Sequence, residues 1–85
     1  DVLQRRAGLA RRANDYDMSI DLNRRLLARD PAYEAAHRQL MLDYLSTGQR
    51  SRAVAQMTLC REALMRHLGV EPEPATQVVF AKVTG

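Results

Sequence analysis

The dipeptide Asp30-Pro31 is the sequence feature that most constrains the fold of this chain. A proline disfavours the α conformation in the residue before it, so a helix cannot run through Asp30. Proline is well suited to the first turn of a helix, where the Asp30 side chain would cap the free amides. We therefore expect one helix to end at about residue 29 and another to begin at about residue 32.

The remaining helix boundaries follow from glycines and prolines that separate apolar residues at helical spacing. Gly48 and Gly69 are expected to follow helices in the left-handed conformation that glycine adopts most easily. The segment 71–74 contains two prolines and predicts an extended linker that opens into a helix at Pro74. Because no segment alternates as a strand would, we predict an all-α chain with helices over about 2–13, 16–29, 32–46, 50–67 and 74–83.

The apolar positions of these helices predict a mainly aliphatic core, because the chain has three tyrosines, one phenylalanine and no tryptophan. Asp15 is expected to cap the helix that follows it. Helical periodicity selects the residues that face inward. The predicted inward residues are Tyr16, Ile20, Leu26, Leu27, Ala36, Leu40, Met41, Tyr44, Ala53, Val54, Met57, Cys60, Leu64, Val79, Phe80 and Val83.

Two parts of the chain resemble each other at a shift of 34 residues, which is the period of the tetratricopeptide repeat. Ser19 and Ala53 correspond under this shift, and a small residue there lets paired helices approach closely. Arg6 and Asn23 depart from the repeat, which has large apolar residues at both positions. An ordinary helical bundle is the alternative to a repeat.

The repeat predicts a single domain over residues 1–85, built as a right-handed helical stack. Two tetratricopeptide-like antiparallel hairpins would span residues 1–31 and 32–68. Residues 69–85 would form the linker and a capping helix, because a stacked repeat leaves its last apolar face uncovered.

The tail carries a more specific resemblance. The run Leu68-Gly69-Val70-Glu71-Pro72, followed by Pro74 and Thr76, resembles the bacterial transcriptional activator domain of SARP-type regulators. That domain is itself tetratricopeptide-like. The resemblance covers most of residues 16–83, and it departs from the family at Gln77 and Phe80, where other residues are common.

The resemblance implies a protein–protein interaction or dimerisation module of a bacterial transcriptional regulator. The partner would be a second copy, another domain of the regulator or the transcription machinery. DNA would be bound by a winged-helix domain that these 85 residues do not include. The chain begins within a helical pattern and without methionine, so we expect it to be part of a longer regulator. A helical regulatory segment of a multidomain ATPase or signalling protein is an alternative.

Two surfaces are candidates for binding. By the usual geometry of the repeat, the first helix of each pair lines a protein-binding groove, here called the inner groove: Gln4, Arg11, Arg38, Leu42 and Leu45. The net charge of +3 arises within residues 1–29 and suggests a second surface that could contact nucleic acid. This basic face comprises Arg5, Arg12, Arg24 and Arg25. A solvated face, with Asp21 paired to Arg24 and Arg25, is its alternative.

The sequence carries no recognisable catalytic, metal-binding or cofactor-binding motif. His37 and His67 lie far apart in the chain, and His37 is expected to be a packing residue. Cys60 falls on a core stripe and is expected to be an inert thiol. The single cysteine suits a reducing cytosol, and no apolar run approaches the roughly 18–20 residues that span a bilayer. We therefore predict a cytoplasmic, non-enzymatic protein with no cofactor, membrane or small-molecule substrate.

Overall fold

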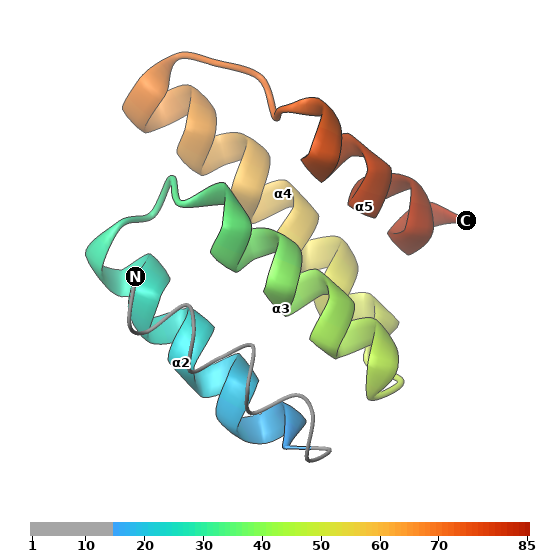
Figure 1. Cartoon of the computed structure of the whole chain (residues 1–85). Coiled ribbons are helices and arrows are strands. Elements are labelled where there is room, and N and C mark those ends of the chain that lie inside the picture. Colours follow the sequence, from blue (N-terminus) through green and yellow to red (C-terminus); the bar gives the residue numbers. More distant parts are fainter. Residues whose placement is uncertain (1–14) are drawn as a thin grey trace.

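Four helices account for most of the chain in the computed structural model, which describes residues 15–85 (Figure 1). No strand occurs within these residues, so the all-α prediction is confirmed, and the helices are arranged as in a tetratricopeptide-like stack. The expected helix over 2–13 lies outside the described residues. The helices are α2 (Tyr16–Arg29), α3 (Glu34–Ser46), α4 (Arg50–Leu68) and α5 (Pro74–Thr84).

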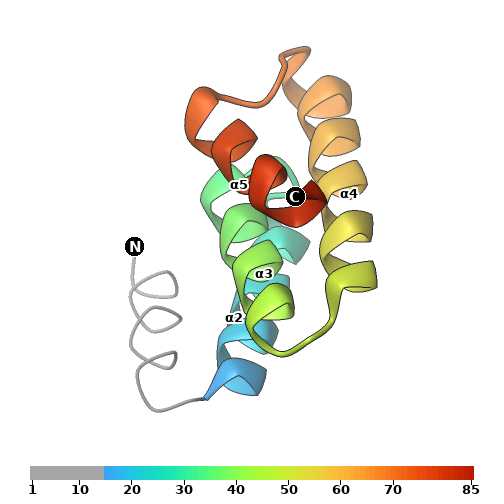
Figure 2. The ribbon, with the colours of Figure 1, turned by 90° about the vertical axis from the view of Figure 1, so that its right-hand side faces the viewer.

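Helix α3 is central to the arrangement. It packs against α2 on one side and against α4 on the other, and both neighbours run antiparallel to it (Figure 1). Helix α5 folds back and lies against α3 and α4, on the side away from α2 (Figure 1, Figure 2). The final helix therefore covers the second hairpin, as expected for a capping helix.

The connection between α2 and α3 differs from the prediction. Helix α3 begins at Glu34, and Asp30 does not cap it. The Asp30 side chain instead accepts a hydrogen bond from the Ala32 amide at 3.3 Å, and its carbonyl accepts one from the Tyr33 amide at 3.1 Å. An aspartate that bonds two residues ahead closes a turn of its own, which competes with the helical cap. Pro31 therefore lies in this turn and not in the first turn of α3.

The other predicted boundaries hold. Gly48 and Gly69 both adopt positive φ, at 73° and 65°, in the left-handed region where a side chain would be strained. Pro74 stands in the first turn of α5 as expected. Asp15 occupies the residue before α2, where its carbonyl accepts the Ser19 amide at 3.2 Å, but its side chain makes no capping hydrogen bond.

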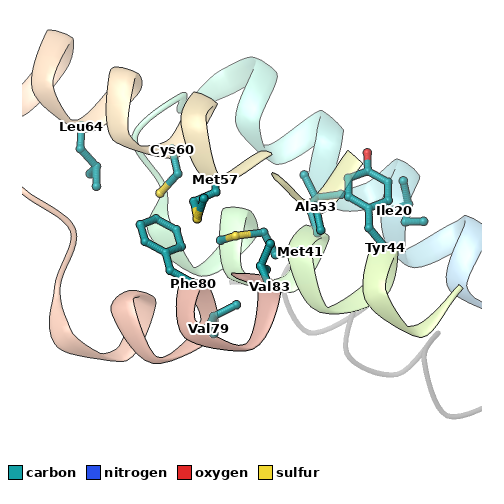
Figure 3. Packing of buried hydrophobic residues seen from close by; sticks show 11 residues of the cluster. Ile20, Met41, Tyr44, Ala53, Met57, Cys60, Leu64, Val79, Phe80 and Val83 are labelled. Atoms are coloured by element: carbon teal, nitrogen blue, oxygen red, sulfur yellow. The ribbon is translucent and has the colours of Figure 1, made fainter. Parts of the chain in front are cut away.

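The core lies between α3, α4 and α5 and extends to Ile20 of α2 (Figure 3). Most of the predicted inward residues are buried there, including the methionines 41 and 57. Tyr16 and Leu27 are half-buried. Val54 is the exception, because it is 41% exposed. Its neighbour Ala53 begins the buried stripe of α4, and one residue along a helix turns the side chain by about 100°.

A buried polar cluster between α2 and α3 was not predicted. The Ser19 hydroxyl donates a hydrogen bond to Asp43 Oδ2 at 2.5 Å, and Gln39 donates one to Asp43 Oδ1 at 3.0 Å. The Asn23 side-chain amide donates to the Ser19 carbonyl at 2.8 Å. Asn23 is thus buried as a hydrogen-bonding residue, where the repeat has a large apolar one. These bonds satisfy most of the polar groups that burial would otherwise leave unpaired, and Asn23 Oδ1 is the one buried polar side-chain atom of the described residues without a partner.

Candidate protein-interaction site

The described part of the inner groove lies along one edge of α3. Arg38, Leu42 and Leu45 follow each other at spacings of four and three residues, so they share a face of the helix. Leu42 and Leu45 are partly buried and pack against the core, with the rest of each side chain open to solvent. Gln4 and Arg11 lie outside the described residues. The structure therefore brings three of the five predicted residues together.

Arg38 is held by the start of α5. Its Nη1 donates a hydrogen bond to Glu73 Oε1 at 2.6 Å and another to Thr76 Oγ1 at 2.9 Å. The contact with Glu73 is also an ion pair. The Arg38 guanidinium is thus fixed where α3 meets α5, and its Nη1 already donates two hydrogen bonds.

Glu34 completes this junction from one turn earlier on α3. Its Oε2 accepts hydrogen bonds from the Glu73 backbone amide at 3.1 Å and from the Thr76 hydroxyl at 2.5 Å. An acceptor there satisfies an amide at the start of α5 that has no partner within the helix. We call the four residues Glu34, Arg38, Glu73 and Thr76 the polar clasp.

The polar clasp was missed by sequence reasoning. A partial signal was available, because Glu34 and Arg38 are four residues apart and therefore share a helix face. Thr76 stands in the first turn of a helix that opens on Pro74. Neither pattern shows that the two groups meet, since that depends on the path of the linker between α4 and α5.

Two further contacts with α4 hold α5 in place. Arg50 donates a hydrogen bond from its Nη1 to the Val83 carbonyl near the end of α5. The Arg61 guanidinium lies 4.7 Å from the centre of the Phe80 ring, a distance at which cation and ring attract. Helix α5 is therefore attached along its length, and the edge of α3 that carries Leu42 and Leu45 has a fixed neighbour.

The basic face is described only in part. Arg5 and Arg12 lie outside the described residues, whereas Arg24 and Arg25 are exposed on α2. Arg25 pairs with Asp21 one turn earlier, with 2.9 Å between Arg25 Nη2 and Asp21 Oδ2. Both side chains are exposed, so this pair contributes little stability. Its presence favours the solvated alternative for this half of the face.

His37 and Cys60 occupy structural positions. His37 is buried, with its Nε2 2.8 Å from the Pro31 carbonyl and its Nδ1 2.7 Å from the Gln56 side-chain amide. Burial lowers the pKa of His37, against the hydrogen bond to Pro31 and the charge of Glu34. Cys60 is fully buried, and this burial raises its thiol pKa to about 11, which keeps it protonated.

Nothing in residues 15–85 assembles a metal site, because no three histidine, cysteine, aspartate or glutamate side chains converge there. None of α2 to α5 has the length and apolar character needed to cross a membrane. The buried His37 and Cys60 are committed to packing.

The helical stack and its final helix, held by the polar clasp, are tetratricopeptide-like. The family of the bacterial transcriptional activator domain matches residues 1–84, and the chain belongs to that family. The match confirms the resemblance that the tail indicated. It is a family of regulatory domains. No curated protein and no solved structure matches the sequence.

Proposed function

We propose that the chain is a protein–protein interaction module of a bacterial transcriptional regulator and that its inner groove binds the partner. Membership of the activator-domain family over residues 1–84 is the observation that carries this proposal. The partner is a second copy, another domain of the same regulator or a component of the transcription machinery. DNA contact then belongs to a separate winged-helix domain, and the regulator acts in the cytoplasm.

The geometry of α3 supports the same proposal. Leu42 and Leu45 are half-buried, so part of each side chain packs against the core and the rest is open to solvent. Side chains of this kind need little reordering when a partner covers them, which lowers the entropic cost of binding. Because Arg38 is held by Glu73 and Thr76, we expect it to keep its end of the inner groove in a fixed geometry. We expect the two leucines to supply the apolar contact with the partner.

The proposal is tested by footprinting the intact regulator, alone and assembled. We expect amide hydrogen exchange to slow on assembly around the inner-groove residues of α3. The double substitution of Leu42 and Leu45 by serine should weaken assembly by about tenfold or more, as loss of buried apolar anchors does at interfaces. Because both leucines touch the core, circular dichroism must first show that the variant is folded.

The matched control is Val78→Ser, which removes an equally apolar but exposed side chain from α5. It should leave assembly unchanged. Unchanged exchange at α3 on assembly, or equal loss in the two variants, would contradict the proposed site.

Direct nucleic-acid binding by the basic face is tested separately, by titrating labelled duplex at two salt concentrations. Phosphate contacts make affinity fall steeply as salt rises. Absent binding, or an affinity that does not change with salt, would exclude this alternative.

A further inference from the structure

A second groove lies between α2 and α4, on a different face from the inner groove. Both helices pack chiefly on α3, which leaves a channel between them with a volume of about 370 Å³. Volumes of roughly 300–1,000 Å³ are typical of concave binding sites. Helix α5 lies on the other side of α3 and α4 (Figure 1, Figure 2). We call this channel the outer groove.

The walls of the outer groove are apolar. Leu27 and Pro31 form the side next to α2, and Leu59 and Ala63 form the side next to α4. Leu59 is 54% exposed, although it stands on a well-packed helix. Together with Leu27, Pro31 and Ala63 it forms an apolar lining rimmed by polar residues, a pattern typical of interaction sites.

The floor of the outer groove is polar but already hydrogen-bonded. His37 and Gln56 line it, and both are buried. The two His37 nitrogens are taken by the Pro31 carbonyl and the Gln56 amide. These ring nitrogens are thus not free to hold the polar head of a small ligand. The groove therefore suits apolar side chains that insert between its walls.

The margins of the outer groove carry mainly positive charge. Arg66 lines one end, four residues after the single acidic lining residue, Glu62, on the same helix. Arg24 is exposed one turn before Leu27 on α2, and Arg52 is exposed two turns before Leu59 on α4. A partner with carboxylates beside its apolar residues would match this pattern, because opposite charge fixes orientation and speeds encounter.

The shape of the site selects a helix as the occupant. Helices α2 and α4 run in the same direction, and α3 already lies between them on one side (Figure 1). A partner helix that lay in the channel, on the side away from α3, would contact both α2 and α4 through residues three or four apart in its own sequence. We propose that the outer groove binds an acidic amphipathic helix of a partner protein, with its apolar face against Leu27, Leu59 and Ala63.

This inference is tested on the 85-residue chain with two synthetic peptides. Each forms an amphipathic helix with leucines along one face, and the other positions are glutamate in the acidic peptide and lysine in the basic peptide. We expect the acidic peptide to bind about tenfold or more tightly than the basic one in fluorescence anisotropy. Shifts of backbone amide resonances should concentrate around Leu27, Leu59 and Ala63.

Matched variants separate the groove from the general surface. Leu59→Ser should weaken the acidic peptide by about tenfold, whereas Val78→Ser on α5, removing a side chain that is 59% exposed, should have no effect. Arg66→Glu should reduce or reverse the preference for the acidic peptide, whereas Lys82→Glu on α5 should not. All four positions are exposed, so the variants should fold as the parent does.

Several results would overturn the inference: no binding of the acidic peptide, equal affinity for both peptides, or equal loss in the control variants. Shifts centred on Leu42 and Leu45 would assign the peptide to the inner groove instead. Sedimentation adds another test, since a dimer dissociated by Leu59→Ser would make a second copy the occupant. Failure here leaves the inner-groove proposal intact, because the two sites share no residue.

Discussion

His37 shows how one buried residue sets a pH dependence. A carbonyl can only accept, so the Nε2 of His37 must carry the hydrogen that bonds Pro31. The neutral ring then leaves Nδ1 free to accept the hydrogen bond from the Gln56 amide. Protonation would place a second hydrogen on Nδ1, facing the amide donor. The fold therefore favours the neutral ring, in agreement with the pKa that burial lowers.

We predict that His37 makes the protein less stable in acid. Its folded-state pKa lies below the ordinary value of 6.5, so the unfolded chain binds more protons between those two values. The contribution to the free energy of unfolding is fully present above pH 6.5 and is lost as the pH falls to the folded-state pKa. Each unit of pKa difference is equivalent to about 1.4 kcal/mol. Urea unfolding from about pH 8 to about pH 5 measures this slope.

His37→Gln should flatten the slope, because glutamine does not titrate. The control Thr58→Gln introduces the same side chain at an exposed position that does not titrate, and it should leave the slope unchanged. A parent and a His37→Gln variant with identical slopes would refute the assignment.

Helix α5 depends on the polar clasp at its start. Thr76 is buried at the centre of the clasp, where it donates to Glu34 and accepts from Arg38. On the core side of α5, Phe80 lies in one cluster with Cys60, the only cysteine of the chain (Figure 3). The reactivity of this thiol therefore reports how often α5 lifts from the core.

We predict that Thr76→Val makes Cys60 react faster with a thiol reagent. Valine keeps the shape of threonine but removes two part-buried hydrogen bonds to charged side chains, which together contribute about 1–3 kcal/mol. An opening equilibrium shifted by this amount should accelerate labelling roughly tenfold. Thr58→Val, which removes an exposed hydroxyl from α4, is the control and should label as the parent does. Equal rates in all three proteins would show that the clasp does not hold α5.

At the scale of the whole described structure, residues 15–85, the arrangement centres on α3, because α2, α4 and α5 all pack on it. Leu40 lies near the middle of this helix and is only 1% exposed. We predict that Leu40→Ala lowers the free energy of unfolding by about 2–5 kcal/mol, through lost burial and the cavity it leaves. Circular dichroism during urea unfolding measures the loss, and Leu68→Ala, at a residue 61% exposed, should cost far less.

Sequence reasoning was most successful where chain geometry decides the outcome alone. Pro74 is restricted to the first turn of its helix, Gly48 and Gly69 reach the left-handed conformation without strain, and periodicity found most of the core. It was less successful where two local solutions compete, as at Asp30, whose side chain closes a turn and does not cap α3. The polar clasp was beyond local reasoning, because the approach of Glu34 to Thr76 depends on how α5 folds back.

The sequence separation of these contacts has a consequence for folding. Helix α2 joins α3 through contacts of smaller sequence separation, as when Ser19 meets Asp43 across 24 residues, whereas the clasp joins Glu34 to Thr76 across 42. Contacts between distant residues close longer loops and form later. During synthesis α2, α3 and α4 can therefore pack together before α5 emerges, with α5 docking as the last step. A chain cut short before Pro74 would leave Cys60 and its apolar neighbours uncovered, a surface that chaperones and proteases recognise.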